Sequence, residues 1–170
     1  MMLILNLVIA IALSLLPLGA SPDPMRYMPL PQDLPDGMIL SKTHLGADMA
    51  FMSWIASIPG PILKVSALAV LSPTENEAEA NLRELIKTAE GWEIDAKCGW
   101  PLGPRVVCFN YKDEAQGYEG YGVAVVEGKM MWALTIIATP NSGGEKWLAN
   151  LSRTIYDRTH QCPPKLCTSA

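Results

Sequence analysis

The stretch PILKVSALAVLSPTENEAEANLRELIKTAEGW, residues 61–92, places a short apolar run directly before an amphipathic segment. The apolar run lies between Pro61 and Pro73, is rich in aliphatic residues and has the length of a buried strand. The sequence therefore predicts a buried strand over residues 63–71.

The second half of this stretch carries the signals of a helix. Thr74 and Glu77 have capping-box spacing, acidic residues occupy the first turn, where the helix dipole favours them, and Gly91 supplies a stop. Five apolar residues recur at intervals of three and four, namely Ala78, Leu82, Leu85, Ile86 and Ala89. The pattern predicts an amphipathic helix over residues 74–90 that covers an apolar surface.

Two hairpins are expected after this helix. Residues 92–98, WEIDAKC, alternate with period two, as a half-buried strand does. Residues 105–111, RVVCFNY, are rich in β-branched and aromatic types, and the intervening GWPLGP has turn chemistry. A second hairpin joins YEGYGVAVV to KMMWALTIIAT through Glu127-Gly128.

A final helix and a proline-rich arm complete the expected elements. The helix over residues 145–157 has one apolar face, made of Trp147, Leu148, Leu151 and Ile155. Residues 21–37 contain five prolines and no apolar period, which predicts an extended, polyproline-like arm that needs no core of its own. Residues 47–57 fit a strand and a helix about equally well.

Strands that pair mostly antiparallel, with helices packed against them, make an α+β domain. We expect a mostly antiparallel sheet, built from the two hairpins and the N-terminal strands, with the two amphipathic helices packed on it. The length suits one domain with a single core, over residues 38–160. Residues 161–170 form a cysteine-containing tail.

The first 20 residues have the shape of a secretory signal peptide. An apolar run from Leu3 to Leu16 is followed by Pro17 and small residues, so cleavage is expected near Ala20. The run is shorter than the ~20 residues of a membrane-spanning helix, but no Lys or Arg precedes it, which leaves an uncleaved anchor as the alternative. We expect a secreted or periplasmic protein with no membrane contact after cleavage.

The charge pattern bears on the class of partner. The chain has a formal net charge of −4, and its 13 basic residues form no cluster. A nucleic-acid backbone attracts clustered Lys and Arg. Nucleic acid is therefore not expected as a partner.

All four cysteines, Cys98, Cys108, Cys162 and Cys167, lie in the part expected to be exported. An even number in an oxidising compartment favours two disulfides. The first hairpin would bring Cys98 close to Cys108, and closing that loop should stabilise the fold by on the order of 2–3 kcal/mol. The tail pair would close a second, smaller loop, and cross-pairing between hairpin and tail stays open.

The order of elements resembles the PsbP-like fold, to which Mog-like proteins also belong. The similarity covers roughly residues 38–158. It rests on the strand PILKVSALAVL leading into NEAEANLRELIKTAE, the meander from WEIDAKC to MMWALTIIAT, and the helix EKWLANLSRTIYD. The resemblance is one of topology: it implies a binding or assembly role without a shared catalytic site, and it transfers no functional residue.

Soft-metal binding is an alternative that the methionines suggest, because thioether sulfur suits Cu(I). Two M-x-x-M pairs have a histidine between them in the sequence, so the candidate ligands are Met25, Met28, Met49, Met52 and His44. Methionine is also an ordinary filler of irregular cores. His160 with the two tail cysteines offers another soft ligand set, for which a disulfide loop is the simpler interpretation. No cofactor is expected.

Signals for catalysis are few. The histidines are His44 and His160, and neither a G-x-S-x-G nor an H-E-x-x-H motif occurs. His44 and Asp48 would share a face only in a helix, and a small hydrolase that uses His44 is the last of the hypotheses. Glu119 and Glu127 flank a strand of the second hairpin as possible paired carboxylates, although exposed glutamates are common at hairpin ends.

Trp100 lies in the turn of the first hairpin. If exposed, an aromatic residue on a disulfide-closed loop would contact a partner, and if buried it would only pack under the loop. We expect an exported, non-catalytic protein that binds another protein, in the manner of an inhibitor, immunity protein or assembly factor. A periplasmic copper-binding protein is the alternative.

Overall fold

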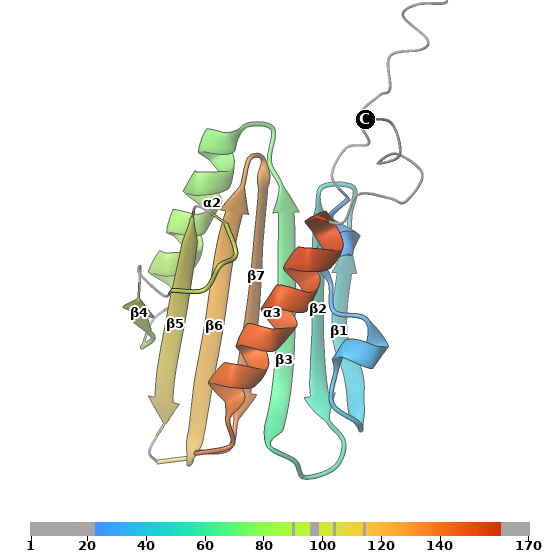
Figure 1. The fold of residues 1–170 in the computed structure, drawn as a ribbon, viewed down its shortest axis with the longest axis vertical. Coiled ribbons are helices and arrows are strands. Elements are labelled where there is room, and N and C mark those ends of the chain that lie inside the picture. The colour runs from blue at the N-terminus through green and yellow to red at the C-terminus, as the bar shows by residue number, and fades with distance from the viewer. Residues whose placement is uncertain (1–22, 90, 96–98, 104, 114, 161–170) are drawn as a thin grey trace, which may run out of the picture.

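The computed structural model describes residues 23–89, 91–95, 99–103, 105–113 and 115–160. Within these residues, a seven-stranded antiparallel sheet carries one α-helix on each face (Figure 1). The predicted α+β class with an antiparallel sheet is confirmed.

The sheet has the strand order β1-β2-β3-β7-β6-β5-β4. One meander contains β1 (Met38–Leu45), β2 (Met49–Ala56) and β3 (Ile62–Leu71). The other contains β4 (Glu93–Asp95), β5 (Val106–Asp113), β6 (Tyr118–Glu127) and β7 (Met130–Ala138). The two meanders join in the middle, where β3 pairs with β7.

The four strands of the second meander pair in sequence order, and the pairing of β5 with β6, between the two hairpins, was not specified by the prediction. Strand β5 pairs with β6 along its whole length, from Val106 to Asp113. Asp113 closes the turn between them, because its carboxylate accepts a hydrogen bond from the Gln116 amide at 3.0 Å and its carbonyl accepts one from Gly117 at 2.8 Å. The tight turn joins both hairpins into one sheet.

Strand β4 is shorter than predicted. It pairs with β5 at the edge of the sheet, and Ile94 is 44% exposed instead of facing the core. The alternating pattern over residues 92–98 therefore does not mark a half-buried strand in the described residues, because the edge position leaves its side chains uncovered. Residues 96–98 lie outside the described residues.

The segment that fitted a strand or a helix is a strand. In β2, Ala50 and Trp54 are buried on one face, as the period of two in a strand requires. Its neighbour β3 shows the same alternation, with Val65, Ala67 and Ala69 buried. The predicted buried strand at residues 63–71 is confirmed.

Helix α2 (Glu75–Thr88) covers one face of the sheet over β6 and β7. The Thr74 hydroxyl accepts a hydrogen bond from the Glu77 amide at 3.2 Å, so the predicted N-cap is present. The predicted apolar face packs on the sheet, with Ala78 and Leu82 buried. We name this face of the sheet the α2 side.

Helix α3 (Gly144–His160) crosses the other face, named the α3 side (Figure 1). Leu148, Leu151 and Ile155 are buried against β6 and β7, and Trp147 is half-buried at the same face. In addition to these two α-helices, the described residues contain two short 3-10 helices, η1 (Pro24–Tyr27) and η2 (Pro31–Asp33).

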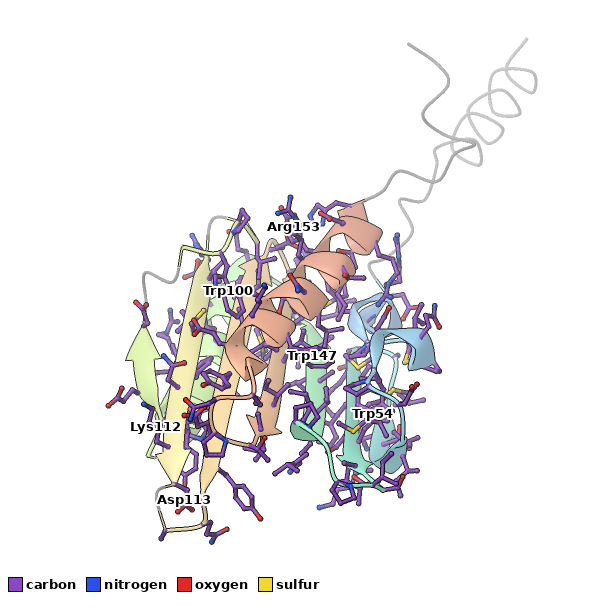
Figure 2. All side chains as sticks on the ribbon, turned by 60° about the horizontal axis from the view of Figure 1, so that its bottom comes forward. Trp54, Trp100, Lys112, Asp113, Trp147 and Arg153 are labelled. Atoms are coloured by element: carbon purple, nitrogen blue, oxygen red, sulfur yellow. The ribbon has the colours of Figure 1, made fainter. Side chains whose placement is uncertain are left out.

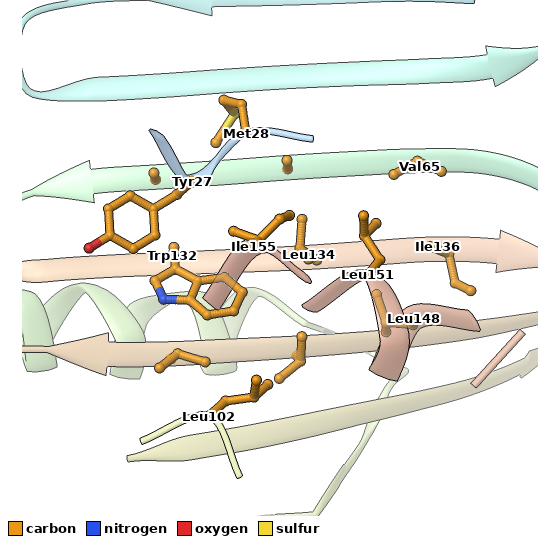
Figure 3. Close-up of a cluster of buried hydrophobic side chains, with 14 of the residues drawn as sticks. Tyr27, Met28, Val65, Leu102, Trp132, Leu134, Ile136, Leu148, Leu151 and Ile155 are labelled. Atoms are coloured by element: carbon orange, nitrogen blue, oxygen red, sulfur yellow. The ribbon is translucent and has the colours of Figure 1, made fainter. Parts of the chain in front are cut away.

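The proline-rich arm differs from the prediction of an extended segment outside the core. Tyr27 and Met28 are buried in the cluster beneath α3, and the Tyr27 ring lies 6.1 Å from that of Trp132 (Figure 3). Two large apolar side chains with no period still offer enough surface to pack across a sheet. The described domain therefore begins in the arm and not at Met38.

None of the helices in the described ranges combines the length and the apolar character that a membrane crossing requires. The predicted signal peptide lies outside the described residues.

Candidate functional site

Strand β1 forms one edge of the sheet (Figure 1). Seven of its eight residues are exposed, and an edge strand presents a row of backbone N–H and C=O groups to its surroundings. The other edge strand, β4, has three residues. Within the described sheet, β1 is therefore the edge that is long enough to pair with another chain.

Apolar side chains gather at this edge. Nine large apolar side chains of the described residues are exposed, and five of these belong to the β1–β2 region: Ile39, Leu40, Leu45, Ile55 and Ile58. Ile39 pairs with Ile55 on the α2 side, whereas Leu40 lies on the α3 side opposite Trp54. The edge offers apolar contacts on both faces. We call these five side chains the edge cluster.

A bulge interrupts β1 beside the edge cluster. The register against β2 shifts between Leu40 and Lys42, and the Ser41 hydroxyl donates a hydrogen bond to the Ser53 carbonyl at 3.1 Å. Bulges and lysines are means by which edge strands avoid uncontrolled pairing. A strand that pairs with β1 must therefore match this irregular edge.

A groove of about 240 Å³ lies on the α2 side, beside the C-terminal half of α2. Its floor consists of short side chains on the central strands, where Ser66 pairs with Thr135 and Leu68 with Ala133. Its walls are larger and mostly aromatic, formed by Phe51, Leu85, Trp92 and Phe109. Short floor residues between large wall residues produce the hollow.

Two glycines of β6 leave room for the aromatic rings that form the walls of the groove. A Cβ atom on Gly120 would lie 2.8 Å from the Trp92 ring, and one on Gly122 would lie 3.2 Å from the Phe109 ring. Trp92 also stacks on Tyr111, with ring centroids 5.5 Å apart. The rings of Trp92 and Phe109 can therefore pack directly on the sheet at the side of the groove.

Trp100, the predicted partner contact, is half-buried and packs against the core cluster on the α3 side (Figure 2). Its loop is held by Leu102, which is 1% exposed. Part of the Trp100 ring remains accessible, but its position is fixed by packing. The structure therefore shows partial burial of Trp100, and its contact with a partner stays a prediction.

Glu127 lies near the end of α3. Its Oε1 atom is 3.0 Å from His160 Nε2, and the other ring nitrogen of His160 lies 2.7 Å from the Tyr156 carbonyl oxygen. Burial raises the pKa of Glu127 above its ordinary value, and the neighbouring His160 opposes that shift. Tyr27, on the same side, has a raised pKa because it is buried and faces Glu127. The pair ties the last turn of α3 to β6.

Glu119 lies at the opposite end of β6 from Glu127. Glu119 and Glu127 are eight residue steps apart on an extended strand, so the two carboxylates are far too distant to act as a catalytic pair. The hypothesis of paired carboxylates is wrong. Glu119 instead accepts a hydrogen bond from the Tyr121 hydroxyl at 2.7 Å, and desolvation together with this contact raises the pKa of Tyr121 to about 12.

The candidate copper ligands lie in different environments. Met28 is buried at 2% exposure, and Met25 is 40% exposed. Met49 and Met52 are three positions apart on β2, so they lie on opposite faces of the sheet. The structure does not bring these sulfur atoms to one point.

His44 is exposed on β1, where it pairs with Phe51. Because this segment is a strand, the helical spacing that would join His44 to Asp48 does not apply. His160 lies in α3, and the tail cysteines that might accompany it lie outside the described residues. Among the residues that the structure describes, no group of three or more His, Cys, Asp or Glu side chains is arranged to hold a metal ion.

Cys108 is buried at 6% exposure and is disulfide-bonded. Asp95 pairs with Cys108 across β4 and β5. The other three cysteines, Cys98, Cys162 and Cys167, lie outside the described residues, so the pairing of Cys98 with Cys108 stays a prediction.

Sequence reasoning missed the edge cluster and the groove. The apolar letters of MIL at residues 38–40 were visible, but an apolar residue in a strand is usually buried, and only the strand order leaves these side chains uncovered. Comparison with known proteins adds no candidate: no family model matches the chain, and no curated protein matches it.

Proposed function

We propose that this chain is an exported, non-catalytic protein that binds another protein through strand β1 and the edge cluster. The observation that carries the proposal is the concentration of exposed apolar side chains on the edge strand β1 and in the adjoining β2 region, where five of the nine in the described residues lie. Exposed apolar side chains that gather in one region, in place of being scattered singly, favour an interaction site there.

The mode of contact follows from the backbone. A strand from the partner that pairs with β1 would satisfy its outward N–H and C=O groups, and the edge cluster would cover alternate side chains of that strand on both faces. The resemblance to the PsbP-like fold over residues 38–158, whose members mostly bind or assemble, supports the same role. Export rests on the signal-like first 20 residues.

Charge favours a foreign strand over a second copy of this chain. Strand β1 carries Lys42 and His44 and no acidic residue. Antiparallel pairing of two β1 strands would bring both lysines close together, and like charges on adjacent strands are destabilising. A partner strand with apolar and acidic residues meets the edge better.

Photocrosslinking tests the proposal. A photoreactive amino acid replaces Leu40 or Leu45, and a control chain carries it in place of Arg153, which is exposed on α3. Crosslinking in the natively exported fraction should join the same protein to both β1 positions and not to the control. Equal crosslinking at all three positions, or none at β1, contradicts the proposal.

A second comparison separates the edge from the Trp100 loop. Leu40→Glu and Trp100→Ala are each tested for capture of the crosslinked protein. Loss of capture in Leu40→Glu alone supports the edge. Loss in Trp100→Ala alone would transfer the contact to the loop and overturn the role of β1.

A further inference from the structure

The side chains that line the groove on the α2 side indicate which kind of ligand it can bind. Most of its lining is carbon, from aromatic and aliphatic side chains, and no charged residue takes part in it. Its polar side chains carry hydroxyl groups. One of them, the Ser66 hydroxyl, lies 3.1 Å from the Ser53 hydroxyl, within hydrogen-bond distance. Such a lining favours an uncharged, largely apolar group in the groove itself.

Positive charge lies just beyond the groove, on the same side of the sheet. Lys42 pairs with Ser53, and Ser53 pairs with Ser66 in the groove floor, so Lys42 lies in the row of side chains that leads into the groove. Lys64 is two positions before Ser66 on β3 and shares its face. His44 pairs with Phe51, which forms one wall.

These charges have no acidic counterpart on the strands that carry them. Strands β1, β2 and β3 contain no Asp or Glu, although the whole chain has a formal net charge of −4. Lys42 and Lys64 are exposed, and neither makes an ion pair with a described residue. The α2 side of strands β1 to β3 is therefore positively charged, although the net charge of the whole chain is negative.

Dimensions connect the groove to the lysines. Two strand spacings, about 10 Å, separate Lys42 from Ser66, and a lysine side chain covers more than half of that distance. With about 240 Å³, the groove is smaller than a pocket for a drug-sized ligand and suits an apolar chain of short to medium length. An apolar chain of that length in the groove would have its end near the lysines.

We propose that the groove binds a medium-chain carboxylate, such as a fatty acid anion of about eight carbons. The alkyl chain lies between Phe51, Leu85 and Trp92, and the carboxylate faces Lys42 and Lys64. Charge complementarity argues for the anion, because a carboxylate at this position gains an attraction to both ammonium groups that a neutral chain of the same length does not gain. This binding does not depend on the proposed contact at β1.

Titration calorimetry with octanoate, octan-1-ol and octyltrimethylammonium tests the assignment. Octanoate should bind in a ratio of one to one, roughly fivefold or more tighter than octan-1-ol, and the cation should bind most weakly. The advantage of octanoate should shrink as salt is raised, because the lysines are exposed. Equal affinity for octanoate and octan-1-ol, or no binding, overturns the proposal.

Matched variants locate the charge contact. The double variant Lys42→Gln/Lys64→Gln should lower the affinity for octanoate to that for octan-1-ol and leave octan-1-ol binding unchanged. Lys146→Gln, an exposed lysine on α3, should leave both affinities unchanged. An equal loss in Lys146→Gln shows a general charge effect and contradicts the site.

Methyl NMR of the wild-type protein locates the chain without a mutation. Octanoate should shift the signals of Leu68 and Leu85, which line the groove, more than those of Leu40 and Leu45 in the edge cluster. The reverse order assigns the binding to the edge and overturns the proposal. So does self-association that covers the groove and that octanoate does not reverse.

Discussion

The guanidinium of Arg158 in α3 donates hydrogen bonds to the Asp33 carboxylate and to the Met28 carbonyl oxygen, each at 2.7 Å. It joins residues 125 and 130 positions apart in the chain. The Asp33 side chain is only 10% exposed, so the contact is shielded from water. The contact holds the arm in place, with its Tyr27 and Met28 buried in the core cluster, and makes it part of the domain.

Arg158→Ala should therefore destabilise the protein more than loss of a surface ion pair does. Removing the guanidinium leaves the Met28 carbonyl without this donor and the shielded Asp33 carboxylate with the Leu30 amide as its remaining donor at 2.8 Å, which costs about 1.5–3 kcal/mol in the free energy of unfolding. Arg153→Ala is the control, because the Arg153–Asp157 pair is exposed at 3.8 Å and should contribute less than about 0.5 kcal/mol. Urea unfolding of both variants measures the difference, and equal midpoints contradict the role of the arm.

Gly120→Ala should displace the Trp92 ring. The added Cβ would lie 2.8 Å from that ring and 3.1 Å from Tyr111 Cβ, so the stack must shift at a cost of about 1–3 kcal/mol. Gly60→Ala is the matched control, since a Cβ there meets nothing within 4 Å. Near-ultraviolet circular dichroism and thermal unfolding report the two effects. An unchanged aromatic signal in Gly120→Ala would show that the wall does not depend on this glycine.

Tyr121 should ionise later than ordinary tyrosines, because its pKa is raised from 10.0 to about 12. A raised pKa means that its contribution to stability is complete below pH 10 and is lost as the pH rises from 10 toward 12. Glu119→Gln should lower this pKa, though not to 10.0, because desolvation is the largest cause of the shift. Tyrosinate absorbance compared with Tyr121→Phe measures it, and a Tyr121 that titrates at pH 10 refutes this environment.

Glu127→Gln should change how stability depends on pH in the acidic range. Burial raises the pKa of Glu127 above 4.5, so the stability that its neutral form contributes is complete below pH 4.5 and is lost as the pH rises through the folded-state pKa. The unfolding free energy of Glu127→Gln should therefore gain on that of the wild type as the pH rises through this range. Glu93→Gln, which removes an exposed carboxyl group on β4, is the matched control. A constant or opposite difference contradicts the shift.

Cys108→Ala should lower stability by about 2–3 kcal/mol if Cys108 closes the predicted loop of about ten residues with Cys98. Peptide mapping without reduction identifies the partner of Cys108 directly. Cys162→Ala is the control and should have a smaller effect, because the predicted tail loop lies at the chain end. A peptide that joins Cys108 to a tail cysteine would replace the predicted pairing by the cross-pairing.

Short-range patterns were enough to predict α2, α3, β3 and the hairpin of β6 with β7. The Thr74 cap, the apolar spacing of α2 and the aliphatic run of β3 are each contained within a few residues, so neighbouring parts of the chain could not alter them. The same reasoning was wrong for Ile94. Its segment alternates as predicted, but no other element covers the side chains of β4, so Ile94 is exposed. It also assigned no core to Tyr27, because a segment without a period can still pack.

The sequence by itself determined the fold class, because periodicity and capping report which side chains form an apolar face. Only the tertiary structure decided which faces are covered. The order of the strands places β1 at an edge, and α2 lies over β6 and β7, so the α2 side of β1 to β3 stays open with its lysines and groove. Local pattern does not encode which distant element lies on a given face, because that choice depends on the packing of the whole chain.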